Sequence, residues 1–270
     1  MNDFYRALKA LAENGGMGVL AEVTNTRGSA PRKAGARMLL SPDGTFSGTV
    51  GGGGLEYFAQ RQAEHVLKTG RGSEKVYSLG GGPGEDIGAI CGGSAAVRFT
   101  PVGSEEAAAL LRNIPAPPRV LLYGAGHVGK ALADALALLG LAVTVTDGRA
   151  GLLTGERFPC AQRCLCPTDD APMEPGPGDM IVIMTHSHSD DYALLRRAMD
   201  TDAPYIGVMA SRIKAAAFRR RLEDDGVSPS DIDRRLRCPI GLPIGAETPE
   251  EIAVSVAAQL VEFLRRQERI

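Results

Sequence analysis

The motif Gly124-x-Gly126-x-x-Gly129 constrains the fold of this chain more than any other feature of its sequence. It follows a short apolar run that is typical of a buried parallel strand, and it opens an Ala/Leu-rich segment, 130–139, that is predicted to be a helix. In such a turn the first glycine permits a tight bend, the second lets the backbone approach a pyrophosphate, and the third lets helix and strand pack closely. The helix N-terminus then faces the phosphates with its partial positive charge. The motif therefore predicts a turn that holds a dinucleotide.

An acidic residue ends the next predicted strand. The apolar run 141–146 follows Gly140 and leads to Asp147, whose carboxylate can accept hydrogen bonds from ribose hydroxyls. Arg149 comes two residues later, so the choice between NAD and NADP stays open. Strand, glycine turn, helix, strand and acid together predict a Rossmann-type parallel sheet, with a dinucleotide such as NAD(P) as a candidate ligand.

The length of 270 residues is enough for two domains. The clearest linker is the run Pro115-Ala116-Pro117-Pro118. We therefore expect an α/β protein with an N-terminal α+β domain over 1–114 and a C-terminal Rossmann-type domain over 119–270. In the first domain, Pro42-Asp43-Gly44 lies between two strand-like runs and predicts a β-hairpin. In the second domain we expect a short helix around residues 231–236 and a last helix that starts at Thr248-Pro249-Glu250-Glu251, with Thr248 as its cap.

Basic and glycine-rich loops mark the first domain. A polar loop after the second predicted element carries Arg27, Arg32, Lys33 and Arg37. The run Gly51-Gly52-Gly53-Gly54 comes directly before a predicted helix, 55–68, and could present successive backbone N–H groups to an anion. The alternative is a flexible turn, and the nearby cations favour the anion site.

Cys91 lies between glycines in a predicted loop, before Gly92 and Gly93. A cysteine with backbone freedom around it can reach a ligand or act as a nucleophile. The alternative is a small buried thiol. The two interpretations stay open.

Polar residues follow the predicted buried strand 179–184, in the run Thr185-His186-Ser187-His188-Ser189. Open α/β sheets bind ligands at the carboxyl ends of their strands. The two histidines could form half of a metal site, or the run could be a polar loop whose Ser189 caps the following helix. We favour a loop that faces the ligand.

Composition limits the function classes. The net charge of -2 and the sequence pI of about 6.1 disfavour a nucleic-acid-binding protein. No apolar run is long enough to span a bilayer and the first residues do not resemble a leader, so we expect a cytoplasmic protein without a membrane partner. The five cysteines suggest no disulfide framework, and the spacing of Cys160, Cys164 and Cys166, predicted to lie in a loop, fits no common zinc site.

Taken together, six ordered motifs resemble the xanthine dehydrogenase accessory factor family over nearly the whole chain. The motifs are Arg27-Gly28-Ser29-Ala30-Pro31-Arg32, the glycine run before Leu55-Glu56, Cys91-Gly92-Gly93, Gly124-Ala125-Gly126-His127-Val128-Gly129, Thr185-His186-Ser187-His188, and Ile244-Gly245-Ala246-Glu247-Thr248-Pro249-Glu250-Glu251-Ile252-Ala253. The resemblance implies a bacterial, cytoplasmic and usually oligomeric chaperone of molybdenum cofactor. Such proteins bind the cofactor (molybdopterin), protect it while a cysteine desulfurase supplies a terminal sulfur, and hand it to the apo-enzyme of a molybdenum hydroxylase. Position 187, a serine here, is where an acid is expected in many members.

Three functions follow as hypotheses: a cofactor chaperone without turnover of its own, an NAD(P)-dependent oxidoreductase, or a protein whose Rossmann domain serves only assembly. We favour the chaperone and assign no catalytic residue. Apolar faces on helix 55–68 and on the last helix predict a homodimer. Cys91 is a candidate molybdenum ligand. The candidate cofactor-binding residues are Arg27, Arg32, Gly51, Gly52, Gly53, Cys91, Gly92, Gly93, Gly124, Gly126, His127, Gly129, Asp147, Thr185, His186 and His188.

Overall fold

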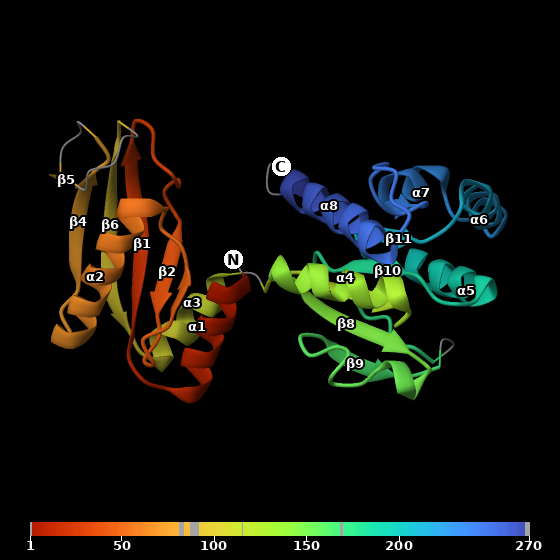
Figure 1. Cartoon of the computed structure of the whole chain (residues 1–270), viewed down its shortest axis with the longest axis horizontal. Helices are drawn as coiled ribbons and strands as arrows, with labels where there is room; N and C mark the ends of the chain where they lie inside the picture. The colour runs from red at the N-terminus through yellow and green to blue at the C-terminus, as the bar shows by residue number, and fades with distance from the viewer. Residues whose placement is uncertain (1, 81–83, 87–91, 115, 168–169, 268–270) are drawn as a thin grey trace. The chain divides into compact units, whose positions relative to one another are not determined.

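The chain forms two compact units, Met1–Pro117 and Pro118–Ile270 (Figure 1). A computed structural model describes residues 2–80, 84–86, 92–114, 116–167 and 170–267. Each unit has its own sheet and its own hydrophobic core. The predicted fold class, a C-terminal Rossmann-type parallel sheet with an N-terminal α+β unit, is confirmed.

The N-terminal unit is a six-stranded sheet with helices on both faces. Its strand order is β3-β2-β1-β6-β4-β5, antiparallel except for the parallel pair β4 and β5. The elements are α1 (Asn2–Asn14), β1 (Gly18–Arg27), β2 (Arg37–Leu40), β3 (Phe46–Gly48), α2 (Gly53–Thr69), β4 (Ser73–Ser78), β5 (Glu85–Asp86), β6 (Ser94–Val102) and α3 (Ser104–Asn113). The predicted hairpin is confirmed, because β2 and β3 pair across Pro42–Gly44.

Helix α2 buries one stripe of side chains against this sheet. Leu55, Ala59, Ala63 and Val66 recur at helical spacing and are all buried in a core that they share with β1, β2, β4 and β6. The helix ends at Gly70, whose left-handed φ of 66° lets its N–H bond back to the carbonyl of Val66. Helices α1 and α3 cover the opposite face through a second, smaller core.

The C-terminal unit is a parallel six-stranded sheet in the order β12-β11-β10-β7-β8-β9. Its elements are β7 (Arg119–Tyr123), α4 (His127–Leu138), β8 (Ala142–Asp147), a short 3₁₀ helix η1 (Ala150–Leu152), β9 (Gln162–Leu165), β10 (Met180–Ile183), α5 (His188–Met199), β11 (Tyr205–Val208), α6 (Arg212–Asp224), α7 (Pro229–Arg235), β12 (Leu236–Arg237) and α8 (Pro249–Gln267). Helices α4 and α8 pack on one face of the sheet, and α5, α6 and α7 pack on the other.

The strand order reverses at β7. The chain runs from β7 through α4 to β8 on one side, and later returns to β10 on the other side of β7. The connections leave β7 and β10 in opposite directions, which opens a crevice at the carboxyl ends of these strands. The glycine motif and the residues 185–187 both lie at these ends.

Three sequence predictions in this unit are corrected. Helix α4 begins at His127 rather than at residue 130, because its N-cap is Gly126 and no side chain marks the start. The cysteine-bearing segment predicted as a loop contains β9, an edge strand whose Gln-Arg-Cys-Leu sequence shows no apolar pattern. The short helix predicted around residues 231–236 ends at Arg235, and Leu236 and Arg237 pair with β11 as strand β12.

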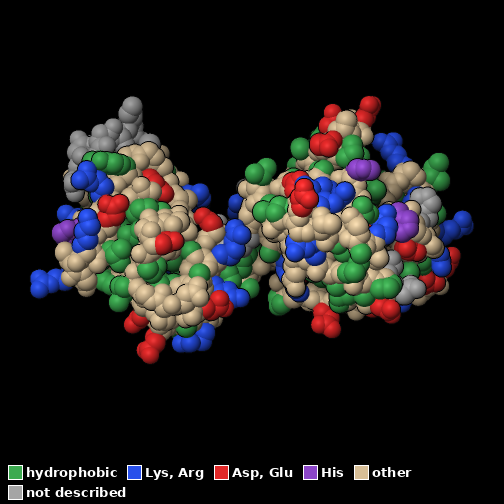
Figure 2. Space-filling view, turned by 60° about the horizontal axis from the view of Figure 1, so that its bottom comes forward, with side chains coloured by type: hydrophobic (Ala, Val, Ile, Leu, Met, Phe, Trp, Pro, Cys, Tyr) green, Lys and Arg blue, Asp and Glu red, His purple; other side chains and the backbone are tan. Residues whose placement is uncertain are grey.

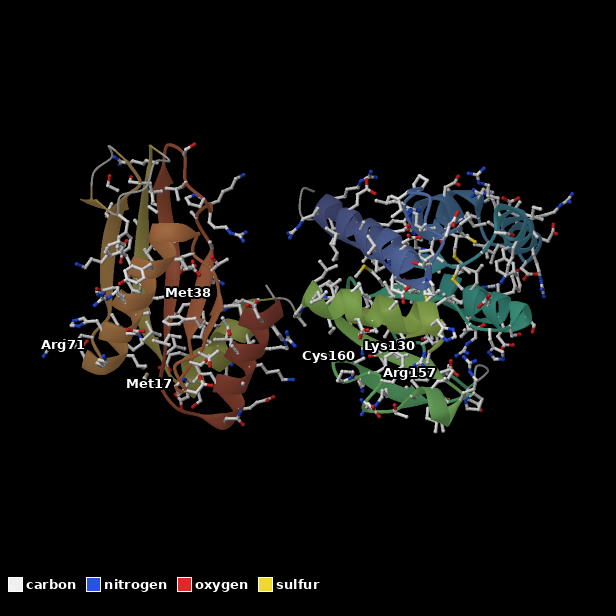
Figure 3. The ribbon with its side chains drawn as sticks, in the orientation of Figure 1. Met17, Met38, Arg71, Lys130, Arg157 and Cys160 are labelled. Atoms are coloured by element: carbon white, nitrogen blue, oxygen red, sulfur yellow. The ribbon has the colours of Figure 1, made fainter. Side chains whose placement is uncertain are left out.

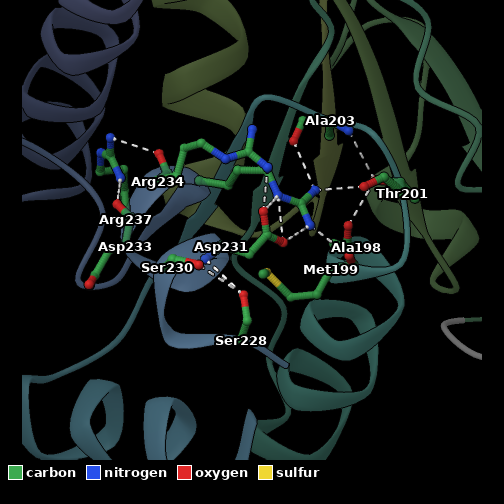
Figure 4. Close-up of polar contacts among 11 residues, drawn as sticks. Ala198, Met199, Thr201, Ala203, Ser228, Ser230, Asp231, Asp233, Arg234 and Arg237 are labelled. Carbon is green, nitrogen blue, oxygen red and sulfur yellow. Dashed lines mark hydrogen bonds and ion pairs between the residues drawn. The ribbon is translucent and has the colours of Figure 1, made fainter. Parts of the chain in front are cut away.

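A buried arginine ties α7 to the turn between α5 and β11 (Figure 4). The guanidinium of Arg235 donates to the backbone carbonyls of Thr201, Ala203 and Met199, and to the carboxylate of Asp231 one helical turn back. Its side chain is 5% exposed. This contact positions the start of β11, the neighbour of the edge strand β12.

Charges of both signs are distributed over the surface. On the face shown in Figure 2, basic and acidic side chains are interspersed in both units. Among the described residues, we find no helix with the length and hydropathy to cross a membrane.

Candidate functional site

The three glycines of the turn after β7 differ in what surrounds them. Gly124 has a φ of 121°, and a Cβ built on it would lie 2.2 Å from the carbonyl oxygen of Met184. A Cβ on Gly129 would lie 2.1 Å from the carbonyl oxygen of Gly124. A Cβ on Gly126 would meet no atom within 4 Å, and Gly126 is the N-cap of α4. The first and third glycines are therefore required by packing, whereas the second leaves open space at the helix N-terminus.

Asp147, at the end of β8, is bound to the glycine turn. Its Oδ2 accepts a hydrogen bond from the N–H of Ala125 at 2.8 Å. The guanidinium of Arg149 donates to both of its oxygens, through Nε at 2.8 Å and Nη2 at 2.7 Å. Burial raises the pKa of Asp147, but the hydrogen bonds and charge of Arg149 and the Ala125 N–H outweigh burial and lower this pKa to about 2. The carboxylate is thus ionised and paired.

A second arginine holds the other side of the turn. Arg157, labelled in Figure 3, donates from Nη2 to the carbonyl oxygens of Ala125 and Gly126 at 3.1 and 3.2 Å. Its Nε is buried and has no hydrogen-bond partner among the described residues. No sequence pattern marks this residue, because it lies in an irregular segment 31 positions beyond Gly126.

The polar run after β10 is anchored by a buried ion pair. Asp191 accepts from the backbone N–H of Thr185 at 3.0 Å and from its hydroxyl at 2.7 Å. The ammonium of Lys214, on α6, contacts the other oxygen of Asp191 at 2.6 Å, and the two side chains are 16% and 4% exposed. Helix α5 is capped by Ser187, which accepts from the N–H of Asp190, and not by Ser189 as the alternative interpretation had it.

These elements line one crevice of about 270 Å³ at the carboxyl ends of β7, β8 and β10. We call it the nucleotide crevice. Its walls are formed by Tyr123, Gly124, Thr146, Asp147, Gly148, Arg149, Cys166, Pro167, Ala171, Thr185, His186 and Leu194. The structure therefore brings together four of the predicted site residues: Gly124, Asp147, Thr185 and His186.

The two remaining histidines of the predicted site lie at helix starts. His127 is the exposed first residue of α4, and His188 is the first residue of α5. Within the part of the chain that the structure describes, no three His, Cys, Asp or Glu side chains are grouped so that they could hold a metal ion.

In the N-terminal unit, two predicted motifs pack directly against each other. A Cβ on Gly93 would lie 2.4 Å from the carbonyl oxygen of Arg27 and 2.5 Å from that of Ser29. Gly28 has a φ of 66°, and its Cβ would lie 3.0 Å from the carbonyl oxygen of Gly92. Only glycine permits this approach, so the loop after β1 and the segment before β6 are built as one unit.

The glycine run before α2 adjoins the same loop. A Cβ on Gly51 would lie 3.6 Å from Cβ of Pro31. We call residues 27–32, 51–54 and 92–93 the loop cluster. Cys91, the candidate molybdenum ligand, lies outside the described residues, next to Gly92 of this cluster.

An acidic side chain occupies part of the predicted anion site. Glu56 accepts from the N–H groups of Val50 and Gly51, at 3.3 and 3.2 Å, and from the hydroxyl of Thr49. Gly51 therefore has no free N–H for an anion, which corrects part of the sequence prediction. Gly52 and Gly53 are exposed, and a Cβ on either would meet no atom within 4 Å.

The basic residues of the loop cluster are open to a ligand. Arg27 and Arg32 are exposed, whereas Arg37 is engaged with Glu22 at 2.8 Å. Arg27 also lines a pocket of about 390 Å³ together with Asn25, Thr26, Val76, Gly84, Ser94 and Ala96. Arg27 and Arg32, the exposed Lys33 beside them and the N-terminus of α2 thus remain for an anionic group.

Two family models match the chain: residues 120–260 match the XdhC Rossmann domain, and residues 11–80 match the XdhC and CoxI family. The chain belongs to the XdhC and CoxI family. This confirms the resemblance that the six motifs indicated.

Three relatives align with nearly the whole chain. It is 32% identical over 266 residues to the uncharacterized protein YqeB of Escherichia coli (strain K12), which aligns 97% of this chain but 46% of YqeB, so the chain spans about half of that relative. It is 26% identical over 334 residues to a probable xanthine dehydrogenase subunit of Bacillus subtilis (strain 168), covering 98% and 99% of the two chains. It is 23% identical over 300 residues to the molybdenum cofactor insertion chaperone PaoD of E. coli (strain K12), covering 97% and 88%.

A crystal structure described as a xanthine dehydrogenase from Bacillus halodurans has the same fold. The TM-score is 0.77, with 24% sequence identity, over 98% of this chain and 96% of that chain. At this identity the likeness concerns the fold.

Proposed function

We propose that this member of the XdhC and CoxI family is a chaperone that binds molybdenum cofactor and inserts it into a xanthine dehydrogenase-type molybdenum hydroxylase. One observation carries the proposal: three separate sequence motifs lie together in the loop cluster, since Gly93 closely approaches the backbone of Arg27 and Ser29 and a Cβ on Gly51 would touch Pro31. The B. subtilis relative is named as a probable xanthine dehydrogenase subunit, and PaoD is named as a chaperone for insertion of molybdenum cofactor.

The loop cluster fits the chemistry of the cofactor. Molybdenum cofactor is a pterin that bears a dithiolene and a phosphate, and it is anionic and fragile. The exposed guanidinium groups of Arg27 and Arg32 can pair with the phosphate. The start of α2 at Gly52 and Gly53 adds backbone donors and the positive end of the helix. A thiolate from Cys91, which precedes Gly92 of this cluster in the sequence, is the proposed ligand of molybdenum.

The chaperone would act in a sequence of binding steps without turnover of its own. It would hold the cofactor while a cysteine desulfurase supplies the terminal sulfur, and it would then release the cofactor to the apo-hydroxylase. The nucleotide crevice of the C-terminal unit would hold a dinucleotide of the NAD(P) type on the turn at Gly126. We place these steps in the cytoplasm.

Cofactor transfer tests this proposal. The protein is loaded with molybdenum cofactor, the pterin is measured by its fluorescence after acid oxidation, and activation of an apo molybdenum hydroxylase is then followed. We expect Cys91→Ser to lower transfer, because serine keeps nearly the same size but cannot supply the thiolate that is the proposed ligand of molybdenum. Cys164→Ser, in β9 of the other unit, is the matched control and should transfer like the parent. Equal transfer by Cys91→Ser and the parent would return Cys91 to a packing role, and absence of pterin from the parent would contradict the chaperone.

We still propose a homodimer, although the apolar helix faces from which it was predicted do not support it. The apolar face of α2 is buried against its own sheet, and the apolar face of α8 is buried against α4 and the parallel sheet. The expectation now rests on the resemblance alone. A monomer mass from light scattering at micromolar concentration would contradict it.

The alternative function is an NAD(P)-dependent oxidoreductase. One observation favours it: His186 lines the nucleotide crevice together with Gly124 of the phosphate-binding turn, where a proton donor could serve a bound substrate. A change in nicotinamide absorbance with small alcohols or aldehydes would support this function, and it should disappear in His186→Ala.

A further inference from the structure

The carboxylate of Asp147 is saturated with hydrogen bonds before any ligand arrives. Its Oδ1 accepts from the backbone N–H of Arg149 at 2.9 Å and from its Nε at 2.8 Å, and its Oδ2 accepts from the N–H of Ala125 and from Nη2 of Arg149. A carboxylate offers about four lone-pair sites, so these four donors fill it. The side chain is 6% exposed. A ribose diol could gain this acceptor only by displacing an existing donor.

Arg149 is the solvent-exposed member of this ion pair. Its side chain is 40% exposed and lines the nucleotide crevice with Gly124 and Gly148. Nε and Nη2 are used on Asp147, and Nη1 makes no hydrogen bond to any residue that the structure describes. Because the guanidinium is planar and held from one side, its remaining donor is oriented in advance for a phosphate oxygen.

The charge around the turn also favours an anion. Asp147 and Arg149 are the two fully charged side chains among the residues that line the crevice, and they balance each other. Arg157 adds a further positive charge through its contacts with the carbonyls of Ala125 and Gly126. Asp147, Arg149 and Arg157 together carry one net positive charge, which suits a ligand with a phosphate beyond the pyrophosphate.

We infer that the nucleotide crevice selects a dinucleotide whose adenosine ribose carries a 2′-phosphate, an NADP(H)-type ligand, and that Arg149 is the residue that recognises this phosphate. Asp147 then acts as a positioning residue for Arg149 and for the turn, and not as the acceptor of ribose hydroxyls. This selection rests on the proposed binding of a dinucleotide in the crevice, and it is independent of the cofactor site in the loop cluster.

The experiment measures nucleotide preference with the full-length protein. NADPH and NADH are titrated by nicotinamide fluorescence, and adenosine 2′,5′-bisphosphate and AMP are compared by calorimetry to isolate the 2′-phosphate. We expect the phosphorylated member of each pair to bind about tenfold tighter or more, as for one charge-assisted contact. Arg149→Ala should abolish this preference, and because it frees acceptor positions on Asp147 for a ribose diol, the variant should bind NADH at least as tightly as the parent. Arg149→Lys should retain part of the preference. Arg220→Ala, an exposed arginine of α6, removes the same charge elsewhere and should leave the preference intact.

Three results would overturn the inference: equal or tighter binding of NADH by the parent, a preference for NADPH that survives in Arg149→Ala, or no binding of either nucleotide. The comparison of ligands on the parent protein stands even if a variant does not fold. Cofactor transfer, measured in parallel, separates the two proposals. If the protein transfers the cofactor but does not prefer one nucleotide, only the role of Arg149 is refuted. If the protein binds no pterin, the chaperone function is refuted, whichever nucleotide the crevice binds.

Discussion

Replacing Gly126 by valine should remove ligand binding while leaving the fold intact. The backbone at Gly126 has a φ of -67° and a ψ of -168°, a region that valine adopts readily, and an added Cβ would enter open space. Valine is a poorer N-cap than glycine by about 0.5–1 kcal/mol, but it also restricts the unfolded chain, which returns about 0.4–1 kcal/mol. We therefore expect the free energy of unfolding to change by less than about 1 kcal/mol.

The effect of Gly126→Val on binding should be larger. The valine methyl groups would occupy the space in which a phosphate meets the N-terminus of α4. The loss of one charge-assisted hydrogen bond, worth about 1.5–3 kcal/mol, weakens binding roughly 10- to 100-fold.

Gly129→Ala is the matched control, with the opposite expected outcome. Its new Cβ would lie 2.1 Å from the carbonyl oxygen of Gly124, a backbone atom that cannot move aside alone. Alanine in a helix gains about 1 kcal/mol over glycine, but overpacking costs up to about 3 kcal/mol, so a net loss of about 2 kcal/mol is expected.

Urea unfolding followed by circular dichroism gives the stability of each variant, and titration with NADPH gives its affinity. If Gly126→Val is folded and binds nucleotide like the parent, the turn is not the phosphate site. If it unfolds as readily as Gly129→Ala, the open space at Gly126 has been misinterpreted.

Three other contacts can be tested. Arg235→Met leaves three backbone carbonyls without their donor and should lower the free energy of unfolding by about 3 kcal/mol, whereas the same change at Arg234, whose side chain is 69% exposed, should cost no more than about 1 kcal/mol. Lys214→Met leaves the buried carboxylate of Asp191 unpaired and should cost about 3–5 kcal/mol in urea unfolding, part of which the double variant with Asp191→Asn should recover. The folded-state pKa of Asp147 is about 2, below its ordinary 3.8, so the ionised carboxylate stabilises the fold fully above the ordinary pKa, and this stabilisation is lost as the pH falls through 2. When the free energy of unfolding is measured against pH, Asp147→Asn should therefore lose less stability in acid than the parent.

The sequence predicted those parts of the fold that depend on neighbouring residues. The strand, turn, helix and strand around Gly124 are encoded within one short stretch, and the hairpin at Pro42–Gly44 is encoded by its turn residues. The capping of α8 by Thr248, which accepts from the N–H of Glu251, was also expected from the sequence and is confirmed. In each case the sequence pattern and the structure that it predicts belong to one short stretch of the chain.

Contacts between distant residues were not predictable in this way. Strand β9 is defined by its pairing with β8 and has no apolar pattern of its own. Arg157 reaches the glycine turn from an irregular segment, and Lys214 reaches Asp191 from the next helix. Glu56 lies only five residues from Gly51, but no pattern in the sequence shows that its carboxylate accepts from the N–H groups at the start of the glycine run. The sequence therefore indicated four residues that the structure brings together in one crevice, whereas the partners that set the charge of this crevice came from the structure.

The hydrogen bonds of Arg157 and Asp147 to the glycine turn affect the kinetics of ligand binding. Two carbonyls and one N–H of the turn are already fixed, so the turn itself does not have to become ordered when a nucleotide arrives. A prepared site of this kind lets related ligands associate at similar rates, because each meets the same surface. Discrimination between two dinucleotides would then reside in how long each stays bound. The turn would distinguish its ligands by residence time.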